Sequence, residues 1–217
     1  CYASSMSTAT IQSAHDVLDF WFGPMPLDKA RLEARMRVWF AGESDQQAAA
    51  RYDQEIRGLL VPLLNKAVND QLANWSASPR RRLALILLFD QVPRNAFRGT
   101  AAAYSFDDRA LALTVEGLRD GADAPLDPVE RLFFYMPLQH AELRSAQEES
   151  LRSYRRLCAD APGELRGVFD SVLTFAEKHA AIIQQFGRFP YRNRVLQRET
   201  TDEEKEWLAT SGESFGQ

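Results

Sequence analysis

The chain has 217 residues, enough for one compact domain that buries roughly 70% of its unfolded surface without a disulfide or metal to hold it. Its 26 basic and 30 acidic residues give a formal charge of −4, which argues against a nucleic-acid binder that uses its whole surface. Asp90 interrupts the apolar run LALILLF, so no run approaches the roughly 18 residues that cross a membrane.

The cysteines indicate the cellular compartment, and the N-terminal residues indicate where the folded domain begins. Cys1 and Cys158 form no disulfide framework and suit no metal knuckle, so a reducing compartment and a soluble cytoplasmic protein are expected. We interpret residues 1–12 as a disordered or vector-derived tail and residues 13–217 as a single all-helical domain.

The first helices are predicted from residues that cap helix N-termini. Ser13 with Asp16 resembles a capping box in front of AHDVLDFWF. Asp28 can cap KARLEARMRVWF, whose apolar residues recur at helical spacing. Ser44 is expected to open a longer helix through DQQAAARYDQEIRGLL.

Prolines divide the next part of the chain. Pro62 should kink or end the third helix, and a further helix then runs to about Trp75. Pro79 suits the first turn of PRRRLALILLFDQ, which is apolar nearly all round and therefore predicted to be buried on most sides. The segment FDQVPRNAFRG, residues 89–99, is interpreted as the loop that follows.

Further start and stop signals follow. Ser105 with Asp108 can cap FDDRALALTVEGLRDG, and Gly121 is a plausible stop. The stretch DPVE at 127–130 is a strong start signal for VERLFFYM, which Pro137 is expected to close.

The last third of the chain also has a helical pattern. A polar helix is expected up to Cys158, and GELRGVFDSVLTFAEKHAAIIQQF then runs to Gly187. Thr201 with Glu204 caps a short final helix. With about nine or ten helices packed as hairpins and no convincing strand, the predicted fold class is all-α.

Two segments share an order of residues that points to a binding function. Each segment contains a phenylalanine, a proline, an Arg-Asn pair and a further arginine, in that order. The two pairs are Arg94 with Asn95 and Arg192 with Asn193. The guanidinium fork of arginine suits carboxylate or phosphate. Alternatively, these side chains satisfy free carbonyls at helix ends, or Arg94 pairs with Asp90.

A third polar segment contains a candidate acid/base pair. On a regular helix His140 and Glu142 would diverge, but in an extended segment after Pro137 they would share a face, where Glu142 could orient the imidazole. His179 could join them in a metal site, although no fixed ligand spacing supports one and a hydrogen-bonded core histidine is favoured. No metal and no cofactor are predicted.

Other chemistries lack their signatures. No GxSxG, Walker-type loop or GxGxxG occurs, which argues against a nucleophile-elbow hydrolase, a P-loop NTPase and a Rossmann enzyme. The arginines of PRRRLALIL are interpreted as a solvated face rather than a nucleic-acid patch.

Four ordered motifs are similar to a bacterial family known as domain of unknown function 924. They are DFWFG, LALILLFDQVPRN with FRG behind it, PLQHAE followed by Gln147, and FGRFPYRN through LQRETTDEE. The resemblance extends from about Asp16 to Phe215 and implies an all-helical fold grouped with tetratricopeptide-like helical hairpins. It implies no activity and no catalytic residue.

The motif positions coincide with the polar residues chosen above. The candidate site residues are Asp90, Gln91, Arg94, Asn95, His140, Glu142, His179, Arg188, Arg192 and Asn193. Val92, Ala141 and Tyr191 depart from the Phe, Ser and His usual in the family. Tyr191 weakens any proton-transfer role for its position.

Three hypotheses follow. In the first, Arg94, Arg188 and Arg192 bring surplus positive charge to one pocket for a small carboxylate or phosphate, with His140 and Glu142 as tentative catalytic acid/base residues. In the second, the protein is a helical scaffold with a groove for a peptide or protein partner. In the third, the polar clusters lock helix ends through internal ion pairs. Neither nucleic acid nor membrane is an expected partner, and oligomeric state is not predicted.

Overall fold

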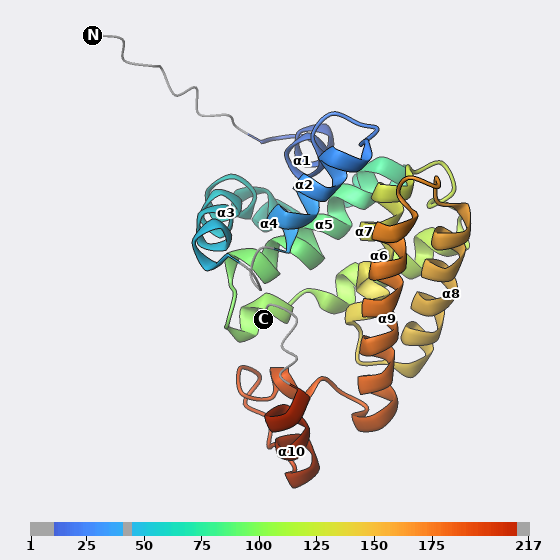
Figure 1. Cartoon of the computed structure of the whole chain (residues 1–217). Helices are drawn as coiled ribbons and strands as arrows, with labels where there is room; N and C mark the ends of the chain where they lie inside the picture. The colour runs from blue at the N-terminus through green and yellow to red at the C-terminus, as the bar shows by residue number, and fades with distance from the viewer. Residues whose placement is uncertain (1–10, 41–44, 212–217) are drawn as a thin grey trace.

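A computed structural model describes residues 11–40 and 45–211 of the chain, and Figure 1 shows its course. The α-helices are α1 (Ala14–Phe22), α2 (Lys29–Trp39), α3 (Gln46–Leu59), α4 (Val61–Val68), α5 (Pro79–Ala96), α6 (Asp107–Arg119), α7 (Pro128–His140), α8 (Arg144–Asp160), α9 (Arg166–Phe186) and α10 (Asp202–Ser211). Short 3₁₀ helices are η2 (Ala73–Ala77), η3 (Ala101–Tyr104) and η4 (Pro190–Arg192). No strand occurs in the described ranges, so the all-α prediction is confirmed.

Several helix starts follow the predicted caps. Ser13 and Asp16 form a capping box, and Asp28 accepts a hydrogen bond at the start of α2. Ser44 lies outside the described residues, and Asp45 caps α3. The predicted tail also lies outside them up to residue 10, whereas Ile11 already packs, partly buried, against the core.

The prolines were interpreted correctly at helix starts and incorrectly inside helices. Pro62 lies in the first turn of α4, so α3 ends before it, but α4 stops at Val68 rather than near Trp75. Pro93 and Pro137 lie inside α5 and α7. The predicted loop at 89–99 is therefore mostly the last turns of α5.

Burial and extra hydrogen bonds explain why these two helices continue past a proline. A proline removes one backbone bond, a loss that tertiary packing can offset when the helix is enclosed. In α5, Arg94 Nη1 and Asn95 Nδ2 each donate at 2.8 Å to the backbone carbonyl four residues before. At the end of α7, Gln147 Nε2 donates to the carbonyls of Leu138 and Gln139 in the last turn and to that of the C-cap residue, Ala141.

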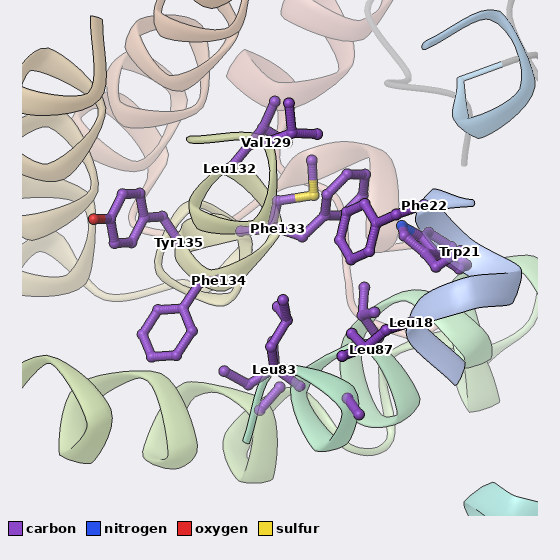
Figure 2. Packing of buried hydrophobic residues seen from close by; sticks show 14 of the residues in the cluster. Leu18, Trp21, Phe22, Leu83, Leu87, Val129, Leu132, Phe133, Phe134 and Tyr135 are labelled. Atoms are coloured by element: carbon purple, nitrogen blue, oxygen red, sulfur yellow. The ribbon is translucent and has the colours of Figure 1, made fainter. Parts of the chain in front are cut away.

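The hydrophobic core lies between α5 and α7, with α1 packed beside them (Figure 2). Figure 2 shows Leu83 and Leu87 of α5 facing Phe133 of α7, with Trp21 and Phe22 of α1 beside them. The rings of Phe22 and Phe133 meet edge to face at 5.5 Å. Because α5 and α7 are buried on nearly all sides, polar residues at their C-terminal ends lie next to the core.

The remaining helices enclose this core and extend it toward the C-terminus. Helices α7, α8 and α9 pack side by side, and α10 stands apart from the main body, in contact with η4 (Figure 1). A separate small cluster of Ile182, Ile183 and Phe189 holds the end of α9 to the segment that follows. No described helix is both long and apolar enough to span a bilayer.

Candidate functional site

The C-terminal half of α5 places a carboxylate inside the protein. Asp90 has no exposed surface and accepts hydrogen bonds from His140 Nδ1 at 2.7 Å and from the side chain of Gln91. Arg94 Nη1 lies 3.1 Å from the same carboxylate. Burial alone would raise the pKa of Asp90, but Arg94 and His140 outweigh burial and lower it. Asp90 is therefore an anion at neutral pH.

The last residue of α7 is oriented by this carboxylate. Because an ionised carboxylate can only accept, Nδ1 of His140 carries the proton. Burial and the nearby Arg94 lower the pKa of His140, although Asp90 opposes them, so the ring is neutral and Nε2 carries a lone pair. The side chain is 14% exposed, which leaves one edge of the cluster open to solvent.

A second carboxylate joins the two arginines. Asp107, in the first turn of α6, binds Arg94 in a bidentate pair with both distances at 2.9 Å. The same carboxylate lies 3.5 Å from Arg192 Nη1, and Asp107 is 19% exposed. We call Asp90, Arg94, Asp107, His140 and Arg192 the central cluster. Four separate elements contribute to it, namely α5, α6, α7 and η4.

Aromatic rings, more than carboxylates, hold Arg192 in place. Its guanidinium carbon lies 4.6 Å from the ring centre of Tyr104 and 4.4 Å from that of Phe189. The side chain is 5% exposed, and its Nε is buried without a hydrogen-bond partner. A buried guanidinium with one long ion pair retains donor capacity.

His179 lies next to the central cluster. Its ring centre is 6.3 Å from that of His140, and Nδ1 is 2.8 Å from the carbonyl of Phe175. Burial lowers the pKa of His179 to about 3, so the ring is neutral. The alternative of a metal site at His140, Glu142 and His179 finds no support, because no group of three or more His, Cys, Asp or Glu side chains in the described chain could hold a metal ion.

The predicted acid/base pair does not form. Glu142 follows α7 between two extended residues, Ala141 and Leu143, but its carboxylate binds Arg198, with Nη1 to Oε2 at 2.6 Å and Nη2 to Oε1 at 3.0 Å. Phe189 N also donates to it at 2.8 Å. His140 pairs with Asp90 instead, because the helix continues through Pro137 and points the two side chains to different partners.

Arg188 and Asn193 also bind outside the central cluster. Arg188 makes a bidentate pair with Glu204 of α10 at 2.6 and 2.8 Å. Asn193 donates to Glu204 at 3.1 Å and accepts from Arg198 at 2.9 Å. We call Glu142, Arg188, Asn193, Arg198 and Glu204 the C-terminal clamp. The prediction that three arginines converge therefore holds for Arg94 and Arg192 and is wrong for Arg188.

Asn95 belongs to a third contact, between α5 and α3. Its side-chain oxygen accepts from Arg98, which forms an ion pair with Asp53 at 2.8 Å. The two Arg-Asn pairs that look alike in the sequence therefore differ. Both arginines reach Asp107, whereas the two asparagines bind separate helix contacts.

The expected surplus of positive charge is absent from the central cluster. The carboxylates of Asp90 and Asp107 balance the two guanidiniums, and His140 is neutral. Sequence reasoning missed Asp107 and Tyr104. It expected Ser105 and Asp108 to cap α6, but Phe106 is the N-cap residue and no side chain caps that helix. An acidic residue near a helix N-terminus is common, so no signal marked Asp107 as a partner for arginine.

Comparisons with known proteins give a family and a similar solved structure. A model of the bacterial protein family DUF924, described as of unknown function, matches residues 17–212. A solved structure of a protein of unknown function from Agrobacterium tumefaciens is 34% identical, with a TM-score of 0.66. The match covers 83% of this chain and 98% of that one. No curated protein matches, and the grouping with tetratricopeptide-like proteins stays a prediction.

Proposed function

Because the chain belongs to DUF924, a bacterial protein family of unknown function, we propose a function from its central cluster. The protein binds a small anionic ligand, a carboxylate or phosphate, at Arg192 and exchanges a proton with it at Nε2 of His140. The observation that carries this proposal is the buried guanidinium of Arg192, whose one ion pair, to Asp107, is long at 3.5 Å.

The cost of burying a cation supports an anion at this position. A buried charge is destabilising unless short hydrogen bonds and an opposite charge compensate it. Arg94 meets this condition with two bonds of 2.9 Å to Asp107, whereas the ion pair of Arg192 to the same carboxylate is longer, at 3.5 Å. A ligand carboxylate or phosphate oxygen that replaces this long contact would form a stronger charge-assisted bond.

The rings around Arg192 restrict how a ligand can meet it. Tyr104 and Phe189 lie over the guanidinium, so an anion is expected at the edge, in the plane of its N–H groups. The more exposed side chains of the cluster, His140 and Asp107, mark the side of entry.

His140 supplies the acid/base part of the proposal. A neutral imidazole whose Nδ1–H is fixed by a buried carboxylate presents Nε2 as a proton acceptor. Asp90 also stabilises the imidazolium that forms when Nε2 takes up a proton. Within the described part of the chain, no serine, threonine or cysteine takes part in the hydrogen bonds and ion pairs of the central cluster, so the base is expected to act on the ligand itself or on water.

Thermal shift with inorganic phosphate and with acetate tests the binding step. A ligand at a hundredfold excess over Kd should raise the wild-type Tm by roughly 5–10 °C. Arg192→Gln should lose this shift. Arg188→Gln is the matched control, because Arg188 lies in the same segment and binds Glu204 instead. If the anions raise the Tm of wild type and Arg192→Gln equally, or raise neither, Arg192 does not bind an anion and its ion pair is structural only.

NMR titration of the imidazoles tests the proton-transfer step. The chain has three histidines, so His140 can be assigned with a single His140→Asn variant. Bound phosphate should raise the pKa of His140, since a nearby anion favours the imidazolium. If phosphate raises the Tm but leaves the pKa of His140 unchanged, the binding function stands and the acid/base role of His140 is contradicted.

A further inference from the structure

Glu142 connects the end of α7 to the segment that carries Arg192. It lies two residues after His140, and its two carboxylate oxygens accept bonds from Arg198 and from Phe189 N. These bonds are 2.6 to 3.0 Å long, within the range of strong charge-assisted contacts. Both oxygens are therefore engaged, which leaves Glu142 poorly suited to act as a base.

Arg198 closes the segment from 189 to 198 into a compact loop. Its Nη2 donates to the carbonyl of Phe189 at 2.9 Å, and its Nε donates to Asn193 Oδ1 at 2.9 Å. The backbone N–H of Arg198 donates to the carbonyl of Asn193 at 2.9 Å. Arg192 lies between these tied positions, and its own N–H donates to the carbonyl of Phe189 at 3.1 Å.

From these contacts we infer that Glu142, through Arg198, is a positioning residue that holds Arg192 at the central cluster beside the Asp90–His140 pair. The inference rests on the proposed function, because the position of Arg192 matters only if it binds an anion. It also assigns a different role to a residue that the sequence pointed to as catalytic. Glu142 fixes the loop backbone, and the aromatic rings of Tyr104 and Phe189 then fix the guanidinium.

The geometry distinguishes positioning from a general contribution to stability. Glu142 is 26% exposed and Arg198 is 23% exposed, so each can regain water if the pair is broken. The core and the Arg94–Asp107 pair do not depend on either side chain. Breaking the pair should therefore loosen the loop while most of the fold remains intact.

The test compares Glu142→Gln, Arg198→Lys and the double variant with wild type. Glu149→Gln is the control, because Glu149 is a glutamate of α8 that pairs with Arg152 and Arg156 at the surface. Phosphate affinity, measured by calorimetry, should fall roughly tenfold or more in each single variant. The double variant should lose little more, since both changes remove one interaction.

A second measurement reports on Arg192 whether or not phosphate binds. The Nε–H of an immobilised buried arginine gives a resolved ¹⁵N NMR signal, assigned with Arg192→Gln. This signal should broaden or disappear in Glu142→Gln and stay in Glu149→Gln. If wild type does not bind phosphate, the proposed function fails, but the Nε–H signal still decides the positioning role. Affinity within twofold of wild type together with an unchanged Nε–H signal would overturn the inference.

Discussion

The central cluster and the C-terminal clamp both pair arginines with carboxylates, but they satisfy the arginines differently. In the clamp, Glu204 is 2% exposed and receives two short bonds from Arg188, one from Asn193 and one from the backbone of Thr201. In the central cluster, the one ion pair of Arg192 is 3.5 Å long, and the Nε atoms of Arg94 and Arg192 are buried without a hydrogen-bond partner. Complete pairing suits a structural joint, and incomplete pairing leaves donors for a ligand.

The largest effect should come from removing the carboxylate at the centre of the cluster. Asp90→Ala leaves Arg94 and His140 without their shared buried acceptor, so the free energy of unfolding should fall by about 3–5 kcal/mol. Urea denaturation measures this loss. The control Asp170→Ala, at an exposed position of α9, should change stability by less than about 0.5 kcal/mol. Equal losses in the two variants would mean that the Asp90 network contributes no special stability.

A smaller and more local effect is expected in the clamp. Hydrogen bonds from Arg188 hold the pKa of Glu204 at about 2, so the group is ionised in ordinary buffers. Glu204→Gln keeps the shape but weakens these bonds, and amide exchange in α10 should accelerate roughly tenfold or more. Exchange in α5 should stay unchanged. Faster exchange in both helices would show that the clamp and the core open together.

The pH dependence of stability is the most gradual effect, since it is spread over several pH units, and it involves His179. The unfolded chain takes up a proton at this histidine near pH 6.5, whereas burial lowers the folded pKa to about 3. The unfolded state therefore binds more protons between these values, and stability should fall as the pH drops from 6.5 toward 3. The slope is at most about 1.4 kcal/mol per pH unit for one group.

Denaturation series at several pH values, for wild type and His179→Gln, measure this contribution. Glutamine has no titratable group, so the slope between pH 6 and 4 should become flatter in the variant. The neutral His140 contributes in the same direction, since its pKa is also lowered, and this part should remain. Parallel curves for the two proteins would mean that His179 is protonated in the folded state.

Local signals predicted much of the helix pattern. Caps at Ser13, Asp28 and Thr201 marked true helix starts, because a side chain that accepts a backbone hydrogen bond acts over three residues. The predictions at the internal prolines were wrong. Proline disfavours a helix locally, so the helices were expected to end near Pro93 and Pro137, but burial of α5 and α7 stabilises the helices through both prolines. That burial depends on helices distant in the sequence.

The site was predicted less completely than the fold. The sequence selected Asp90, Arg94, His140 and Arg192, and the structure brings these together. It could not say which acid pairs with which base, because ion pairing depends on side-chain directions after packing. Glu142 was assigned to His140 on chain proximity, yet it binds Arg198, which lies 56 positions away.

The placement of Arg192 against Tyr104 has a practical consequence for spectroscopy. A cation against an aromatic face shifts the electronic transitions of the ring, so displacement of Arg192 should alter the near-ultraviolet circular dichroism of tyrosine. The four tryptophans, at 21, 39, 75 and 207, make none of the ring contacts to this guanidinium. The tyrosine circular dichroism therefore reports on the position of Arg192 without an attached dye.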